Sequence, residues 1–321
     1  MRVAAIDLGT NSTRLLVADV GPDGGLEEVE RRLTITRLGE GVGARRRLLP
    51  LPVARVRNCL SHYRRRLEVL GAERTLAVAT SAVRDAENGK AFLGEIEWSY
   101  GFTTRLLSGT EEAALTWQGV NAGRASEDGT AVVDIGGGST ELVLGGRAGA
   151  RFSASLDLGC VRNTERHLRS DPPAADELEA CASAARTLLA EHIPAEIRAA
   201  IAGVVGVAGT VTTLAALDLG LERYDPERIH GHVLGRAAVE REVERLASLP
   251  LERRREVPGL EPARAPVIVA GAVILREILA ELGADAIEAS ERDLLHGAAL
   301  QAALLPVGTE GDALPGASTS C

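Results

Sequence analysis

Aromatic side chains are scarce in this chain of 321 residues, which has three Phe, three Tyr and two Trp. We therefore expect an aliphatic core built on Ala, Leu and Val. Its four cysteines, Cys59, Cys160, Cys181 and Cys321, form no C-x-x-C pair and no Cys/His cluster with zinc spacing. We interpret the first three as reduced, small apolar residues and Cys321 as part of a loose tail.

Long apolar runs and an excess of positive charge are also missing. No apolar run reaches the roughly 20 residues that cross a bilayer, and the first residues read as a strand rather than a signal peptide. We expect a cytoplasmic protein that contacts no membrane, with a homodimer as an allowed assembly. The net charge of −9 argues against a nucleic-acid partner. Three arginine clusters, at 45–47, 64–66 and 253–255, are candidates for drawing in an anionic substrate against the global charge, although solvated surface is the favoured interpretation.

Two short stretches resemble each other, DLGTNST at 7–13 and DIGGGST at 134–140. In each, an Asp ends an apolar run, glycine follows, and a Ser-Thr pair closes the stretch. This pattern predicts strand, glycine turn and strand, with backbone N–H groups and hydroxyls that bind anions. An ionised Asp beside phosphate needs a cation between them, so the pattern also predicts Mg²⁺. The alternative is two ordinary β-turns with incidental Ser-Thr pairs.

Strands alternate with helices along most of the chain, and the pattern restarts after the polar segment 121–130. Such alternation predicts an α/β fold with largely parallel sheets flanked by helices. We expect two domains, 1–124 and 125–305, followed by a tail, 306–321, whose composition is typical of disorder. Residues 2–38 read as three short strands in hairpin order.

Several motifs together resemble known proteins. VAGTVTTLAAL, at 207–217, is a glycine turn that opens a helix, a place where anions bind. With the twin turns, it resembles the actin-like ATPase superfamily. IDLGTNSTRLLVAD at 6–19, TSAVRDAEN at 80–88, LSGTEEAALTWQG at 107–119 and DIGGGSTEL at 134–142 resemble the exopolyphosphatase/guanosine pentaphosphate phosphohydrolase (Ppx/GppA) family, over roughly residues 3–304.

This resemblance implies two ribonuclease H-like, actin-like domains with mixed sheets and an active site in the interdomain cleft. It implies hydrolysis of the terminal phosphate of inorganic polyphosphate, or of the 5′ γ-phosphate of guanosine pentaphosphate, with Mg²⁺ or Mn²⁺. More distant alternatives are an ATP-dependent sugar or acid kinase and an actin-like nucleotide-binding sensor without turnover.

Two adjacent glutamates compete for the role of general base. Ser108 and Glu111 have the S-x-x-E spacing of a capping box, which gives Glu111 a structural task. Glu112 is then free to face the cleft, and the family resemblance places its catalytic glutamate at this second position. The alternative for Glu112 is a solvated residue in the first turn of the helix.

The remaining site residues are predicted from the turns and from the resemblance. Arg84 follows a strand and suits a phosphate, although an ion pair with Asp85 or Glu87 competes. Arg14 is expected to begin a strand and face the sheet edge. The predicted catalytic residues are Glu112 and Glu141, and the predicted metal ligands are Asp7, Asp134 and Glu141. The predicted phosphate-binding residues are Gly9, Thr10, Asn11, Ser12, Arg84, Gly136, Gly137, Gly138, Ser139, Gly209 and Thr210.

The chain departs from the longer family members in two ways. Leu295-His296-Gly297 stands near a position where they carry Arg-Glu-Gly, which favours a structural or cleft-lining His296. The fold is also expected to stop near Leu305, before the additional helical domain of those members. We infer a preference for short polyphosphate. His230 and His232 are interpreted as part of a polar turn rather than a metal pair.

Overall fold

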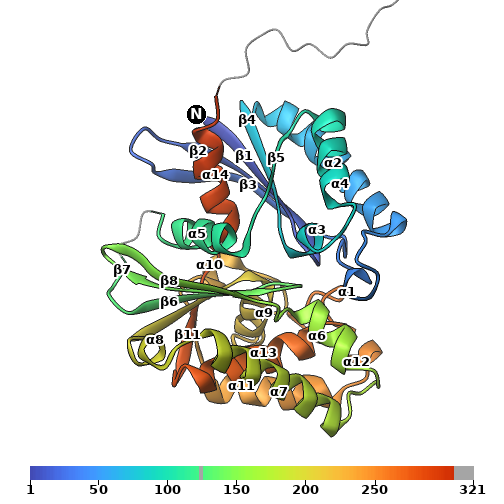
Figure 1. Cartoon of the computed structure of the whole chain (residues 1–321), viewed down its shortest axis with the longest axis vertical. Helices are drawn as coiled ribbons and strands as arrows, with labels where there is room; N and C mark the ends of the chain where they lie inside the picture. The colour runs from blue at the N-terminus through green and yellow to red at the C-terminus, as the bar shows by residue number, and fades with distance from the viewer. Residues whose placement is uncertain (123–125, 307–321) are drawn as a thin grey trace, which may run out of the picture.

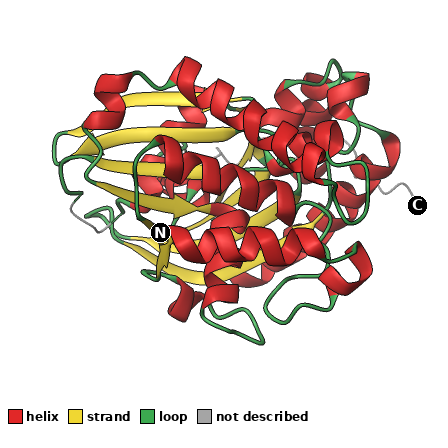
Figure 2. Cartoon of the chain, turned by 90° about the horizontal axis from the view of Figure 1, so that it is seen from below, coloured by secondary structure: helices red, strands yellow, loops and turns green. Residues whose placement is uncertain are grey.

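The computed structural model describes residues 1–122 and 126–306, which form two sheets flanked by helices (Figures 1 and 2). Except for Pro306, the predicted tail lies outside the described residues. In the described part of the chain, no helix combines the length and the apolar character needed to span a bilayer.

The first sheet has the strand order β3-β2-β1-β4-β5. The pairs β1–β2 and β2–β3 are antiparallel, whereas β1–β4 and β4–β5 are parallel. The sheet is therefore mixed, and the three hairpin-ordered strands predicted over residues 2–38 are confirmed. Its strands are β1 (Arg2–Leu8), β2 (Ser12–Val20), β3 (Leu26–Ile35), β4 (Arg74–Ala79) and β5 (Thr103–Leu106).

The second sheet repeats this arrangement. Its order is β10-β11-β9-β6-β7-β8, and β6, β7, β8, β9 and β11 correspond to β1, β2, β3, β4 and β5. The added strand β10 pairs antiparallel to β11 at the edge. Its strands are β6 (Thr130–Ile135), β7 (Thr140–Gly146), β8 (Gly149–Leu156), β9 (Gly203–Val207), β10 (Val233–Gly235) and β11 (Ala286–Ala289).

Helices of the first half cover one face of the first sheet and fill the space between the sheets. Val56, Leu60 and Ile96 are buried in an aliphatic core against β1, β2 and β4. On α5, Trp117 packs against valines of the second sheet, so this helix lies between the two sheets (Figure 1). The helices are α1 (Val42–Arg45), α2 (Pro50–Leu70), α3 (Ser81–Arg84), α4 (Gly89–Tyr100) and α5 (Gly109–Val120).

Helices of the second half pack on the second sheet, except for the last one. In α14, Leu295 and Ala298 join a core with Val3, Ala5 and Leu16 of the first sheet. The domain limits at 124 and 305 stay a prediction, but the chain returns to the first sheet before it ends. The helices are α6 (Cys160–His167), α7 (Ala175–His192), α8 (Ala195–Ala199), α9 (Ala208–Asp218), α10 (Pro226–Ile229), α11 (Arg236–Ser248), α12 (Leu251–Arg255), α13 (Ile268–Glu281) and α14 (Leu294–Ala303).

One arginine cluster is not a simple solvated face. Arg254 is buried, and its guanidinium donates to the carbonyls of Leu246, Leu249 and Ala265 and pairs with Asp171. The interpretation of 253–255 as solvated surface is therefore wrong for Arg254. Its carbonyl partners lie at the end of α11 and in the segment that connects α11 to α13, and charge patterning alone does not reveal this role or the distant partner Asp171.

Candidate active site

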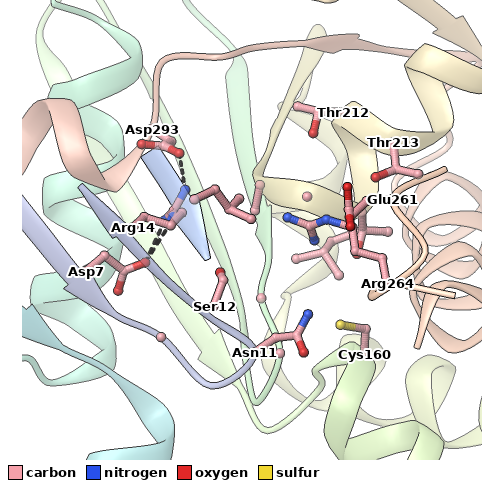
Figure 3. A pocket seen from close by; sticks show the side chains of 18 of the residues that line it. Asp7, Asn11, Ser12, Arg14, Cys160, Thr212, Thr213, Glu261, Arg264 and Asp293 are labelled. Carbon is pink, nitrogen blue, oxygen red and sulfur yellow. Dashed lines mark hydrogen bonds and ion pairs between the residues drawn. The ribbon is translucent and has the colours of Figure 1, made fainter. Parts of the chain in front are cut away.

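The twin turns line one cavity of about 690 Å³ between the two halves of the molecule (Figure 3). Gly137 packs directly against the first turn, because a Cβ there would lie 2.9 Å from Thr10 Cβ and 3.1 Å from Asn11 N. The expectation that the turns face each other across one cleft is confirmed. The predicted residues that line the cavity are Asp7, Gly9, Thr10, Asn11, Ser12, Glu112, Asp134, Gly136, Gly137, Ser139, Gly209 and Thr210.

In each Ser-Thr pair, the serine lines the cavity and the threonine does not. Ser12 and Ser139 line it, whereas Thr13 Oγ1 bonds to Thr36 Oγ1 at 2.9 Å and Thr140 donates to the carbonyl of Leu158. The expectation that the threonine hydroxyls serve as phosphate donors is therefore wrong. Thr13 and Thr140 are fully buried and hold each turn to its own domain.

The residue opposite the strand-end aspartate differs between the two units. In the first, Asp7 pairs in register with Arg14, and in the second, Asp134 pairs with Glu141. Arg14 Nε donates to Asp7 Oδ2 at 2.9 Å, and Arg14 also pairs with Asp293 (Figure 3). The expectation that Arg14 faces the sheet edge is wrong, since its side chain is 11% exposed and points into the cleft.

The second unit instead concentrates negative charge. Burial raises the pKa of Asp134 to about 7, against the opposing effect of Arg14. Burial and the charge of Asp134 raise the pKa of Glu141 to about 8. Thr116 Oγ1 donates to Asp134 at 3.4 Å, and Ser155 Oγ donates to Glu141 at 2.7 Å. These bonds are too few to offset the burial of two carboxylates.

Glu112 belongs to the same acidic cluster. Its side chain is buried, and burial with the charges of Glu141 and Asp134 raises its pKa well above the usual value. Arg84 acts in the opposite direction, and its Nη1 lies 3.3 Å from Glu112 Oε2. Arg84 Nη1 also donates to the carbonyl of Leu107 at 2.8 Å. Its carboxylate partner is Glu112 rather than Asp85 or Glu87, and Asp85 pairs with Arg162 instead.

The capping box predicted for α5 is present. The N–H of Ser108 donates to Glu111 Oε2 at 2.9 Å, and the N–H of Glu111 donates to Ser108 Oγ at 3.2 Å. The Ser108 N–H, together with Arg105, lowers the pKa of Glu111 to about 2. Glu111 is thus a half-exposed cap while Glu112 is buried in the cleft, which confirms the structural division between the two neighbours.

Three predicted residues lie beside the cavity rather than on its lining. Arg84 contacts Glu112, which lines the cavity. Glu141 is the residue of β7 that pairs with the cavity-lining Asp134 of β6. Gly138 packs against α3, where a Cβ would lie 2.3 Å from Ser81 Oγ. Gly138 therefore has a packing role in this arrangement.

Divalent-cation binding fits the unpaired atoms of the cluster. Asp7 Oδ1 and Glu141 Oε2 are buried without a hydrogen-bond partner in the described residues. Hard cations such as Mg²⁺ prefer carboxylate oxygens and complete their shell with waters and phosphate oxygens. No group of three or more His, Cys, Asp or Glu side chains in residues 1–122 and 126–306 is already arranged to hold a metal ion. Asp7, Asp134 and Glu141 would therefore hold a cation together with waters and phosphate oxygens, rather than as a preassembled three-residue site.

Sequence reasoning missed Arg264, which lies over the third glycine turn. A Cβ on Gly209 would lie 1.8 Å from Arg264 Nη1, so the absence of a side chain at Gly209 makes room for the guanidinium. Ala208, which precedes it, has a φ of 65°. Arg264 and the start of α9 together bring positive charge to the cavity wall opposite Arg14 (Figure 3).

Sequence reasoning also missed Asp293, which caps α14. Asp293 Oδ1 accepts from the N–H of Leu295 at 2.9 Å, and its Oδ2 pairs with Arg14 and Arg31. Although burial acts the other way, these arginines hold the pKa of Asp293 well below its usual range. The cap pattern could have revealed its place at a helix start, but not its partners Arg14 and Arg31, which lie 279 and 262 residues away in the sequence.

The histidines take structural positions. His296 Nδ1 accepts from the N–H of Asp293 at 3.2 Å, and its Nε2 bonds to Glu28 at 2.8 Å, so the expected structural role is confirmed. His232 Nε2 bonds to Asp218 at 2.9 Å, and His230 Nδ1 accepts from the N–H of Glu291 at 3.3 Å. The two histidines have separate partners, in accord with a polar turn.

The two sheets share one strand order and their glycine turns line one cavity, so the chain has an α/β fold of two mixed sheets flanked by helices. The family model of the Ppx/GppA phosphatases matches residues 16–305, and the chain belongs to this family.

Relatives and solved structures agree with this family. Exopolyphosphatase 2 of Mycobacterium tuberculosis is 40% identical, with 94% of this chain and 98% of the relative covered. A crystal structure of an exopolyphosphatase-like protein matches with a TM-score of 0.87 and 33% identity, covering 92% of this chain and 97% of that chain. The Aquifex aeolicus Ppx/GppA protein matches with a TM-score of 0.80 and 32% identity, covering 95% of this chain and 98% of that chain.

Proposed function

We propose that this protein is an exopolyphosphatase that removes the terminal phosphate of inorganic polyphosphate by in-line attack of water. The observation that carries the proposal is the buried Glu112, which faces two glycine turns beside the acid pair Asp134 and Glu141. Exopolyphosphatase 2 of Mycobacterium tuberculosis, 40% identical over nearly the whole chain, supports this substrate class.

Each group has a distinct task in this reaction. The backbone N–H groups and the hydroxyls of Ser12 and Ser139 bind the terminal phosphate oxygens from both sides of the cleft. Glu112 accepts a proton from the attacking water, and Arg84 orients the Glu112 carboxylate. Asp7, Asp134 and Glu141 would hold a divalent cation, which would supply the positive charge that phosphate needs in order to approach these carboxylates. Positioning and charge neutralisation provide most of the catalysis in phosphoryl transfer.

Guanosine pentaphosphate is the second candidate substrate. The cavity extends beyond the twin turns to Thr212, Tyr224 and Arg264. Its volume of about 690 Å³ lies within the range of pockets that hold a small molecule such as a nucleotide.

The test is phosphate release by the purified protein from triphosphate, long-chain polyphosphate, guanosine pentaphosphate and ATP, each with and without Mg²⁺. We expect release from polyphosphate that needs Mg²⁺ and yields orthophosphate with slightly shortened chains. Mid-length fragments at early times would contradict binding at the chain end. Release from guanosine pentaphosphate alone would establish the second candidate instead.

A further inference from the structure

A second cavity, of about 800 Å³, lies outside the cleft and is lined by residues of the edge strand β3 and helix α2. The walls combine apolar and basic side chains, with Leu33 and Tyr63 among the apolar ones. Four of the lining residues are arginines: Arg32, Arg55, Arg65 and Arg66. We call this cavity the β3–α2 groove.

The groove carries more positive than negative charge, although the whole chain has a net charge of −9. Arg32 and Arg66 share a single carboxylate, Glu30. Arg55 pairs with Glu40. Arg65 bonds to His62 Nδ1 at 2.8 Å, and no carboxylate of the described residues pairs with it. One arginine of the Glu30 group and Arg65 therefore remain unneutralised.

The groove adjoins the active-site cavity. Arg32 and Leu33 of β3 line both cavities, so they form the boundary between them. A chain whose end is bound in the cleft would pass this boundary before it reached Arg65 and Arg66. Such continuity suits a linear substrate with a negative charge at every unit.

The side chains of β3 disfavour another protein strand as the occupant. The strand is at the edge of its sheet, and Glu27, Glu28, Glu30, Arg31 and Arg32 follow one another along it around Val29. Charged side chains on an edge strand obstruct strand pairing. An unbranched polyanion needs no backbone pairing and gains from the arginines.

We propose that the β3–α2 groove binds the distal phosphates of a polyphosphate chain whose terminal phosphate lies in the cleft. This inference rests on the proposed function, because it names the path of that same substrate. The groove makes affinity depend on chain length while the chemistry at Glu112 is unchanged.

The test compares two neighbouring arginines of α2. Arg65 lines the groove, whereas Arg64 lies outside it and bonds to Glu68 and the carbonyl of Tyr100. Arg65→Gln and Arg65→Glu are measured against Arg64→Gln and Arg64→Glu, with KM and kcat determined for triphosphate and for long-chain polyphosphate at several salt concentrations. Binding of long-chain polyphosphate is also measured without Mg²⁺, so that it does not depend on turnover.

We expect Arg65→Gln to raise KM for the long chain by about fivefold near 0.1 M salt, and to lower the slope of log KM against log salt by about 0.7. Arg65→Glu should raise KM further, with kcat and the triphosphate KM unchanged. The Arg64 variants should behave as wild type. Equal effects on triphosphate and on the long chain, or equal effects at both arginines, would overturn the proposal.

The two proposals fail in different ways. If the wild type releases no phosphate from any polyphosphate, the proposed function fails. Tight, salt-dependent binding of the long chain that Arg65→Glu weakens would still establish the groove as a polyanion site. If a second copy of the chain is the occupant instead, Arg65→Glu will change the sedimentation coefficient and leave polyphosphate binding intact, and the groove proposal falls.

Discussion

The two strand–turn–strand units have the same backbone arrangement, but their side chains differ in charge. In the first, Asp7 pairs with Arg14 across the hairpin. Arg14 also forms an ion pair with Asp293, the residue that caps helix α14. In the second, Asp134 faces Glu141, and Glu112 adds a third acid. The same backbone pattern thus carries an Asp–Arg pair in the first hairpin and an excess of acids at the second, and we propose that the second contributes most of the carboxylates for a cation. The difference rests on one position, arginine in β2 and glutamate in β7.

The largest expected effect comes from Glu112, the acid that completes the second unit. Glu112→Gln keeps size and hydrogen bonding but cannot take a proton from water, so kcat should fall about 10²–10⁴-fold. Polyphosphate binding should survive, because the turns are untouched. Initial rates and binding measured under one condition check this.

The matched control is the neighbouring glutamate. Gln also serves in a capping box, so Glu111→Gln should cost a few tenths of a kcal/mol in helix stability, about the scale of a weakened first-turn charge. An inactive Glu111→Gln beside an active Glu112→Gln would reverse the assignment.

The next largest effect is on stability and concerns Asp293, the ion-pair partner of Arg14 in the first unit. Removing one partner of a buried ion pair costs about 3–5 kcal/mol, so Asp293→Ala should lower the free energy of unfolding by about that amount. Asp293→Asn keeps a residue that caps α14 but leaves Arg14 and Arg31 without their shared carboxylate. We expect Asn to lose most of the stability that Ala loses, as measured by denaturant unfolding. Wild-type stability in Asp293→Asn would show that the cap, not the ion pairs, matters.

A smaller effect is the pH dependence of the cation-free protein. The pKa of Asp134 is about 7 and that of Glu141 about 8, both above the values of the unfolded chain. Their protonation therefore stabilises the folded state fully below about pH 4, and this contribution is lost as pH rises through 7 and 8. Tm in a chelator should fall over this range, by about 1–2 °C for each kcal/mol lost from a chain of this length.

Mg²⁺ and a neutral variant provide the controls for this pH dependence. Mg²⁺ should reduce the fall in Tm, because it neutralises the ionised carboxylates. Glu141→Gln should flatten the Tm profile without metal. A Tm that rises between pH 5 and pH 8.5 without metal would contradict the raised pKa values.

Local patterns predicted the elements of this fold better than their long-range partners. The twin turns, the cap at Ser108 and the exposure difference between Glu111 and Glu112 follow from spacings within a few residues, and the structure bears them out. Arg14 was misplaced because its role depends on Asp293, far along the chain. The packing of α14 on the first sheet likewise depends on contacts between residues far apart in the sequence, which the local hydrophobic pattern does not predict.

The most direct test of the comparison uses the two residues that stand in register. Phosphate release from polyphosphate is titrated with Mg²⁺ for wild type, Glu141→Gln and Arg14→Gln. If the second hairpin holds the cation, Glu141→Gln should raise the half-saturating Mg²⁺ concentration at least about tenfold, the scale for losing a group that supports a metal site. Arg14→Gln should not raise it, because it removes a positive charge from the cleft. A higher Mg²⁺ requirement in Arg14→Gln with an unchanged one in Glu141→Gln would contradict the assignment of the cation to the second hairpin.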